Sequence, residues 1–247
     1  MAQNDALENC DGLCVYGGDG TLREVVAGLV ARHDDRRPPV GILPGGTGNS
    51  MLMHGGGDEW LPAVEAIARG VTMPLDVVRV TLPEETTYCT NLIGWSSAAA
   101  ISARAERWRL LGPARYSLAA IWQIARARPE HLVLTCDGQR TSDDFLLALA
   151  CNTRYGGRRM LVAPQARIDD GLLDLLLVRG ASRRQMLQLF SRIYDGSHVH
   201  LPFVEFRTVR HLTVEQNQPG SLTLDGELYA ARTATIEVLP AALRLFA

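Results

Sequence analysis

The chain has 247 residues, 47% of them hydrophobic, and a formal net charge of -2 at pH 7. This length allows one large domain or two small ones built around a sizeable apolar core. The near-neutral charge argues against nonspecific nucleic-acid binding, so no nucleic-acid partner is expected.

Cysteine usage and hydropathy bear on location. The five cysteines are odd in number and lack paired metal-binding spacing, which favours free thiols in a reducing compartment. No apolar run reaches the roughly 18 residues needed to span a bilayer, and the polar N-terminus is unlike a signal peptide. The sequence therefore predicts a cytoplasmic protein that contacts membranes only peripherally.

Residues 1–74 are expected to form an α/β domain that binds a nucleotide. Short apolar strands are expected at 13–16 and 40–43, and helical patterns follow at 25–31 and 61–68. Strands that alternate with helices are typical of a parallel sheet with helices on its faces.

Residues 75–247 are expected to form a second, β-sandwich-like domain. Strands are expected at 75–82, 88–93, 131–137, 145–151, 172–178, 211–215, 221–224 and 234–239. Helices are expected at about 102–126, with a break near Gly112-Pro113, and at about 182–194, with Ser182 as the N-cap. The expected fold class is α/β plus β, an α/β nucleotide-binding domain followed by an antiparallel β-sandwich-like domain.

The most informative motif is GGDGT, at residues 17–21, between the first expected strand and its helix. Glycines allow the backbone to approach a ligand closely, and a helix N-terminus offers unpaired N–H groups to an anion. An aspartate here would repel a bare phosphate, so Asp19 indicates that Mg²⁺ or a transferable proton lies between them. A second turn, PGGTGN at residues 44–49, follows the next strand, and the pair predicts one nucleotide cleft at the carboxyl edge of the sheet.

Two common nucleotide-binding motifs are excluded. A Walker loop requires a lysine, and the chain contains none. A dinucleotide fingerprint requires a third glycine where this chain has Arg23. The expected ligand is therefore a nucleoside triphosphate with Mg²⁺.

Taken in order, the motifs resemble those of the diacylglycerol kinase and sphingosine kinase family of lipid kinases. They are GGDGT with Glu24, PGGTGN, Leu75-Asp76, APQARIDDGLLD at residues 163–174 and LDGE at residues 224–227. The resemblance spans nearly the whole chain and implies that ATP binds in a cleft between the two domains. It assigns the following residues to ATP: Gly17, Gly18, Asp19, Gly20, Thr21, Glu24, Gly45, Thr47, Asn49, Arg109 and Arg115.

The resemblance also assigns roles to carboxylates. Asp225 and Glu227 match the D-G-E element proposed to act as base or metal ligands. Asp170 matches a magnesium-site aspartate of bacterial members, and Asp76 an aspartate of the same acidic network. A lipid hydroxyl must lie in line with the γ-phosphate and lose its proton late. Asp225 is the favoured base, with Asp19 on the ATP–metal side, and the reverse assignment stays open.

The chain departs from the family pattern at three places. Only 16 residues precede GGDGT, where relatives have further strands, so an exposed sheet edge is expected. A start codon placed too far downstream, a fragment and a truncated protein that binds without catalysing are the open explanations. Ser50 replaces an aspartate common in bacterial diacylglycerol kinases, which removes one hydrogen-bond link. Ser102 and Ala100 stand where sphingosine kinases carry acidic residues for the substrate amine, which favours a neutral lipid.

The sequence thus predicts an ATP- and Mg²⁺-dependent lipid kinase that phosphorylates a lipid hydroxyl, with diacylglycerol-like substrates first and a sphingoid base or ceramide second. One alternative is an NAD kinase, which the later motifs disfavour, and another is an inactive lipid- or nucleotide-binding pseudokinase or fragment. The basic helix around Trp108 and Trp122 is compatible with contact at a membrane surface, or with simple packing on the sandwich. The oligomeric state is not predicted.

Overall fold

The computed structural model describes residues 7, 10–34, 36–46, 48–55, 57–157 and 159–247. The strands are β1 (Leu13–Gly17), β2 (Val40–Pro44), β3 (Thr72–Thr81), β4 (Thr86–Cys89), β5 (Leu92–Ser96), β6 (Glu130–Cys136), β7 (Gln139–Cys151), β8 (Leu173–Arg179), β9 (Val204–Val209), β10 (His211–Leu224) and β11 (Glu227–Phe246). The helices are α1 (Asp19–Val30), α2 (Ser50–His54), α3 (Trp60–Arg69), α4 (Ser97–Arg107), α5 (Arg115–Arg126) and α6 (Arg183–Arg192), with 3-10 helices η1 (Arg109–Ala114) and η2 (Ser197–His200).

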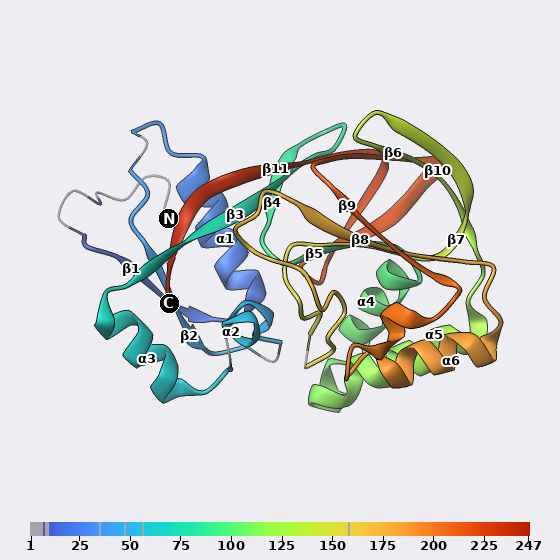
Figure 1. Cartoon of the computed structure of the whole chain (residues 1–247), viewed down its shortest axis with the longest axis horizontal. Helices are drawn as coiled ribbons and strands as arrows, with labels where there is room; N and C mark the ends of the chain where they lie inside the picture. Colours follow the sequence, from blue (N-terminus) through green and yellow to red (C-terminus); the bar gives the residue numbers. More distant parts are fainter. Residues whose placement is uncertain (1–6, 8–9, 35, 47, 56, 158) are drawn as a thin grey trace.

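The strands of the described residues join in one hydrogen-bonded sheet. Its main path runs β1-β2-β11-β10-β5-β7-β8-β9, with β3, β4 and β6 attached beside it. Helices α1, α2 and α3 lie with β1 and β2 at one end of the molecule, and α4, α5 and α6 lie together at the other (Figure 1). This arrangement agrees with the expected fold class, α/β plus β.

The α/β part is built on a parallel pair of strands. β1 and β2 pair in parallel, and Val26 and Leu29 of α1 are fully buried in the core beside them. The end of the chain returns to this core, because Leu245 of β11 pairs in parallel with Val40 and Leu243 is buried nearby. The N-terminal packing unit therefore includes residues that the sequence division at 74/75 places in the second domain.

The β-rich part buries both faces of its central strands. In β8, Leu173, Leu175 and Leu177 point into the core enclosed by the curled sheet. Leu176 and Val178 point to the other face, which α6 covers with apolar side chains. A strand buried on both sides reads as a near-continuous apolar run, which explains why β8 was recognisable from the sequence.

Several elements differ from those expected. The strand expected at 88–93 is divided into β4 and β5. The N–H groups of Thr90 and Asn91, which lie between them, donate to the side chain of Asp225 instead of to a neighbouring strand. The two strands expected at 211–215 and 221–224 form the single strand β10 with a register shift between Glu215 and Gly220. The short helix α2 and strand β9 were not expected. The break between α4 and α5 and the N-cap of α6 at Ser182 were predicted correctly, and Ser182 also forms a capping box with Gln185. No described helix is long and apolar enough to cross a membrane.

Candidate active site

The two glycine turns lie against each other at the carboxyl ends of β1 and β2. The Gly45 N–H donates to the Gly17 carbonyl at 3.0 Å. A methyl group on Gly46 would come within 2.4 Å of the Gly18 Cα, and one on Gly18 within 2.9 Å of the Gly46 Cα. Only glycine permits this contact, so the turns form one backbone-lined corner at the N-terminus of α1. Such a corner suits an anionic phosphate group.

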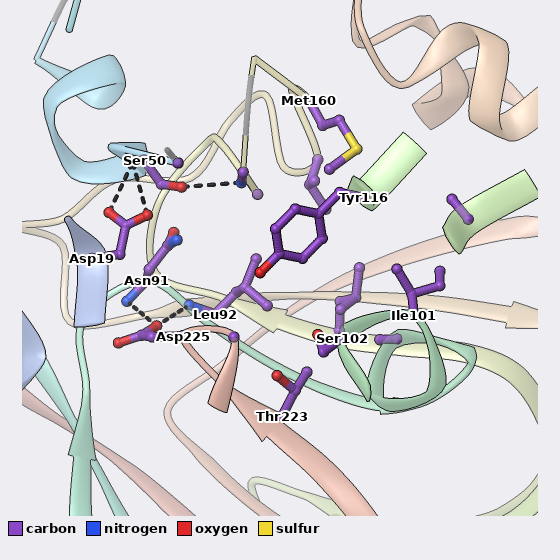
Figure 2. Close-up of a pocket in the computed structure, with 18 of the residues that line it drawn as sticks. Asp19, Ser50, Asn91, Leu92, Ile101, Ser102, Tyr116, Met160, Thr223 and Asp225 are labelled. Carbon is purple, nitrogen blue, oxygen red and sulfur yellow. Dashed lines mark hydrogen bonds between the residues drawn. The ribbon is translucent and has the colours of Figure 1, made fainter. Parts of the chain in front are cut away.

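A cavity of about 420 Å³ begins at this corner and continues to side chains of α4, α5 and α6. Figure 2 shows residues that line it. Its polar end is lined by Gly18, Asp19, Gly20, Thr21, Gly46, Gly48, Ser50, Asp225 and Glu227. Its other end is lined by apolar side chains of the sheet and helices, including Ile124, Leu147, Leu149, Met186, Leu189 and Phe190. One cavity therefore joins a phosphate-type corner to an apolar chamber.

Asp19 is the first residue of α1, and its carboxylate faces the start of α2 (Figure 2). The Ser50 N–H donates to both oxygens, at 2.8 and 3.1 Å, and the Met51 N–H donates to Oδ1 at 3.4 Å. Burial raises the pKa of Asp19, the Ser50 N–H opposes this effect, and the negative charge of Asp225 adds to it. Asp19 is thus an oriented carboxylate with an increased tendency to hold a proton.

Asp225 occupies the Asp-Gly turn between β10 and β11, with a φ of 50°. Such a turn is typical of a two-residue hairpin. Its Oδ1 accepts from the Asn91 N–H (3.0 Å), the Leu92 N–H (2.9 Å) and the Cys89 thiol (3.0 Å). Its Oδ2 accepts from the Thr90 N–H (2.9 Å) and hydroxyl (3.2 Å). Because a carboxylate offers about four lone-pair positions, these five donors occupy it and fix the β4–β5 connection.

Glu227 lies on the same hairpin and forms an ion pair with Arg23 of α1. Arg23 is buried, and it also donates to the Tyr229 hydroxyl at 2.7 Å. The Glu227 side chain remains 48% exposed at the rim of the cavity. The sequence identified Glu227 but gave no sign that Arg23 would be its partner, because the two are 204 residues apart.

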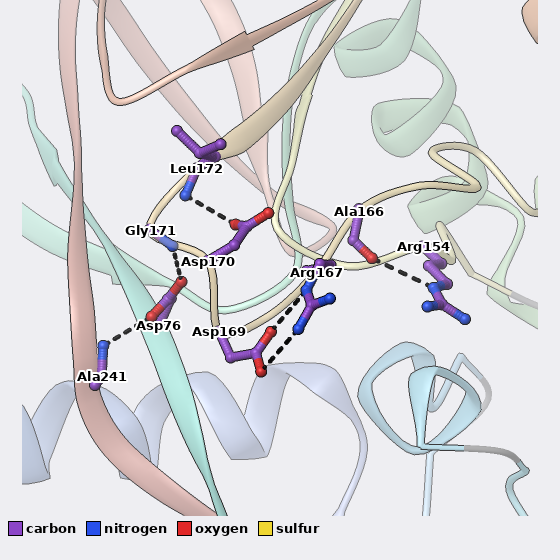
Figure 3. A network of polar contacts seen from close by, with 9 residues as sticks. All are labelled: Asp76, Arg154, Ala166, Arg167, Asp169, Asp170, Gly171, Leu172 and Ala241. Carbon is purple, nitrogen blue, oxygen red and sulfur yellow. Dashed lines mark hydrogen bonds and ion pairs between the residues drawn. The ribbon is translucent and has the colours of Figure 1, made fainter.

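The two predicted metal-site aspartates lie in a separate polar network (Figure 3). Asp76 is buried, and its carboxylate accepts from the Gly171 and Ala241 N–H groups, both at 2.7 Å. Burial raises the pKa of Asp76. Asp170 accepts from the Leu172 N–H at 3.0 Å. Within the described part of the chain, no three His, Cys, Asp or Glu residues are arranged to hold a metal ion, so the metal roles of Asp170 and Asp76 stay predictions.

The remaining predicted ATP residues are placed as follows. Arg115 lines the cavity, whereas Glu24 is exposed on α1 and is not among the lining residues. Asn49 is buried, and its Oδ1 accepts from an N–H of the second glycine turn at 3.1 Å. Thr47 and the side chain of Arg109 fall outside the described structure.

One element of the site was missed in the sequence. The connection between β7 and β8 brings Gly156, Gly157, Met160 and Val162 to the cavity. The Gly156-Gly157 pair, which follows the end of the buried strand β7 by five residues, was the available signal, since the first two glycine turns also follow strands. This connection supplies the wall of the cleft opposite α2.

Comparison with known protein families identifies the class. Residues 1–80 match the family described as diacylglycerol kinase catalytic domain. Residues 92–247 match the family described as YegS C-terminal NAD kinase beta sandwich-like domain. The chain therefore belongs to the diacylglycerol kinase and YegS-like family of lipid kinases, which are phosphotransferases.

Individual relatives agree with this assignment. Diacylglycerol kinase from Mycobacterium tuberculosis is 32% identical over 242 residues, which cover 95% of this chain and 76% of that protein. The protein named probable lipid kinase YegS-like from Chromohalobacter salexigens is 37% identical over 242 residues, covering 94% and 74%. The chain spans 57% of the length of sphingosine kinase 1 from Arabidopsis thaliana, at 25% identity and covering 89% of this chain. The fold resembles that of a diacylglycerol kinase from Bacillus anthracis, with a TM-score of 0.70 at 20% identity, covering 96% of this chain and 76% of the other.

Proposed function

We propose that the chain is an ATP- and Mg²⁺-dependent kinase that transfers the γ-phosphate of ATP to the hydroxyl group of a diacylglycerol-like lipid. The observation that carries this proposal is the single cavity that joins the glycine corner to the apolar chamber. The corner suits a triphosphate, and the chamber suits an acyl chain, as expected for a site lined mainly by apolar side chains. The lipid hydroxyl and the phosphate can then meet at the polar end, where Asp19 lies.

The donor set fits ATP and Mg²⁺. The backbone of the glycine corner and Arg115 offer N–H groups to phosphate oxygens. Mg²⁺ is usually held by one or two carboxylates together with substrate phosphates, and Glu227 at the exposed rim is the carboxylate that would hold it here. When bound, the ion would neutralise charge on the transferred phosphate.

The geometry favours Asp19 as the group that accepts the proton of the lipid hydroxyl. Asp225 has its oxygens occupied by five donors from the β4–β5 connection. Among the described residues, Asp19 accepts backbone hydrogen bonds from the Ser50 and Met51 N–H groups at the start of α2, and burial raises its pKa, which suits a general base. The sequence-based preference for Asp225 stays a prediction, and the reverse assignment is the one we propose.

A neutral lipid is the first choice of substrate. Ser102 lines the cavity at a position where, by the family resemblance, sphingosine kinases carry an acidic residue for the amine of their substrate. Glu106, one helical turn further along α4, also lines the cavity and keeps a sphingoid base as the second candidate. The two substrates are distinguished by Glu106→Gln, which should lower activity on sphingosine and leave activity on diacylglycerol within about twofold.

We further propose that the helical face beside the chamber rests on anionic membranes. Leu110, Leu111, Leu118 and Ile121 are exposed on η1 and α5, and Leu187 is exposed on α6. Helices α4, η1, α5 and α6 contain only one acidic residue and these arginines: Arg104, Arg107, Arg109, Arg115, Arg126, Arg183, Arg184 and Arg192. At the surface of an anionic bilayer, exposed apolar side chains can enter the boundary between headgroups and acyl chains, and the arginines among them can contact the anionic headgroups.

Vesicle binding tests this surface. The protein should sediment with vesicles that contain phosphatidylglycerol and much less with phosphatidylcholine alone, and Leu110→Ser/Leu111→Ser should weaken binding about tenfold. Val71→Ser removes another exposed apolar side chain, outside this helical face, and serves as the control. Equal binding by both variants would remove this face as the membrane contact. Cell fractionation, with the protein expected in the cytoplasm and at membranes, tests the proposed location.

The activity is tested by phosphate transfer from labelled ATP, with Mg²⁺, to diacylglycerol, ceramide and sphingosine in mixed micelles, and to NAD in parallel. A labelled lipid that Asp19→Asn does not produce supports the proposal and identifies the substrate class. A labelled product from NAD alone would support the NAD kinase alternative. Absence of any product from folded protein that binds ATP would support a pseudokinase or fragment.

A further inference from the structure

Ser50 is the residue at which the two sides of the cleft meet (Figure 2). It is fully buried at the start of α2, and its N–H donates to both oxygens of Asp19. Its hydroxyl oxygen accepts from the N–H of Gly157 at 3.0 Å. Gly157 belongs to the β7–β8 connection, so one residue, through its backbone N–H and its hydroxyl, links the Asp19 carboxylate to a segment from the other half of the molecule.

This segment is held on the α2 side at further points. We call its residues 154–157 and 159 the bridging loop. The Arg154 N–H donates to Nδ1 of His54 at 3.3 Å, and Arg159 lies 3.9 Å from a carboxylate oxygen of Asp58. Burial and the neighbouring Arg154 lower the pKa of His54 to about 4, so at neutral pH the ring is uncharged and its Nδ1 can accept this bond. The bridging loop is therefore docked on acceptors from the N-terminal part of the chain.

We propose that Ser50 is a positioning residue for phosphate transfer, which couples docking of the bridging loop to the orientation of the Asp19 carboxylate. The inference rests on the proposed kinase function. A serine hydroxyl both accepts and donates, so its oxygen can accept from Gly157 while its hydrogen is available to Asp19. The Ser50 side chain lowers the pKa of Asp19, in opposition to burial. An aspartate at position 50 would accept from Gly157 but, when ionised, would have no proton to donate.

Ser50 affects the Asp19 carboxylate differently from the charged groups around it. Asp225, on the β10–β11 hairpin, raises the pKa of Asp19 by charge repulsion. Glu227 of the same hairpin is paired with Arg23 of α1. His54, at the other end of α2, is uncharged at neutral pH. Within the described surroundings, Ser50 is thus the side chain that stabilises the ionised form of Asp19.

The test compares Ser50→Ala, Ser50→Thr and the unmodified enzyme in steady-state lipid phosphorylation between pH 5.5 and 9. Loss of a hydrogen bond to a charged group should lower the turnover of Ser50→Ala about tenfold near pH 6.5 and displace the acidic limb upward by roughly 0.5–1 pH unit. The KM for ATP should change by less than about twofold, because the glycine corner is untouched. Ser50→Thr, which keeps the hydroxyl, should retain the position of the limb.

Hydrogen exchange supplies a readout that does not depend on lipid phosphorylation. The Gly157 amide should exchange roughly tenfold faster in Ser50→Ala and stay protected in Ser50→Thr. An unchanged acidic limb together with unchanged exchange in Ser50→Ala would overturn the inference. If the unmodified enzyme phosphorylates no lipid, the proposed function fails, and the exchange comparison still decides whether Ser50 holds the bridging loop.

Discussion

Replacing Asp225 with asparagine should damage the fold more than it damages ATP binding. In the native protein its carboxylate accepts five hydrogen bonds from residues 89–92. Asparagine has one acceptor oxygen, and the best use of it is to keep the bonds from Asn91 and Leu92. Its NH₂ group then faces the N–H of Thr90, a residue with no exposed surface.

The cost follows from this conflict between donors. A buried N–H left without an acceptor costs about 1–3 kcal/mol, and loss of the negative charge weakens the bonds that remain. Together these effects should lower the free energy of unfolding by about 2–4 kcal/mol, which for a chain of this length lowers Tm by roughly 5–10 °C. Turnover should fall as well, because the β4–β5 connection forms part of the cavity wall.

Asp19→Asn is the comparison variant for Asp225→Asn, and it should lose turnover while keeping its stability. The asparagine oxygen can still accept from the Ser50 N–H, and the raised pKa of Asp19 shows that burying its charge is unfavourable. The stability of Asp19→Asn should therefore stay within about 1 kcal/mol of the native value, while turnover is abolished and ATP binding persists.

Urea unfolding at pH 7, with nucleotide binding and turnover measured on the same samples, separates the two roles. The reasoning is refuted by an Asp225→Asn variant as stable as the native protein but inactive, because that result identifies Asp225 as the base. Substantial residual turnover in Asp225→Asn alongside an inactive Asp19→Asn supports the assignment proposed here.

Three further outcomes are expected. Gly46→Ala should abolish ATP binding and destabilise the fold by about 2 kcal/mol or more, because the alanine methyl group would lie 2.4 Å from the Gly18 Cα. Calorimetric titration with ATP measures the binding. Normal ATP binding by this variant would contradict the close packing of the two glycine turns. Leu189→Trp should fill the apolar chamber and lower activity on long-chain lipids by at least about tenfold, with ATP binding unchanged. If this variant is equally active on short-chain and long-chain lipids, the chamber is excluded as the acyl-chain site. Burial and Asp170 raise the pKa of Asp174 to about 6, so the contribution of this carboxyl to stability should fall as pH rises from about 4 to 6. Asp174→Asn should therefore be more stable than the native protein by about 1 kcal/mol above pH 6.5, after allowance for solvent screening. Unfolding curves at pH 7.5 that show no difference between the two proteins would contradict this.

Much of the fold and part of the site were set by local sequence. The two glycine turns were recognisable because close backbone approach requires glycine at those positions, whatever surrounds them. The apolar segments in β3, β6 and β7, separated by turn signals such as Asp137-Gly138, identified these strands. Gly70, with a φ of 68°, ended α3 as expected because a left-handed backbone favours glycine.

The roles of the carboxylates were decided only by tertiary structure. The sequence ranked Asp225 as the base from its motif, yet the residues that occupy its oxygens come from a turn more than 130 positions earlier. Ser50 looked like a lost hydrogen bond in the sequence, whereas its hydroxyl accepts from Gly157, 107 positions away. The apolar chamber needs α4, α5, α6 and the sheet together, and the N-terminal core needs Leu243 and Leu245 from the end of the chain. Local patterns specify which residues can form a turn or a strand. Which donor faces which acceptor depends on long-range packing, and that packing determines whether a carboxylate is occupied or available to take a proton.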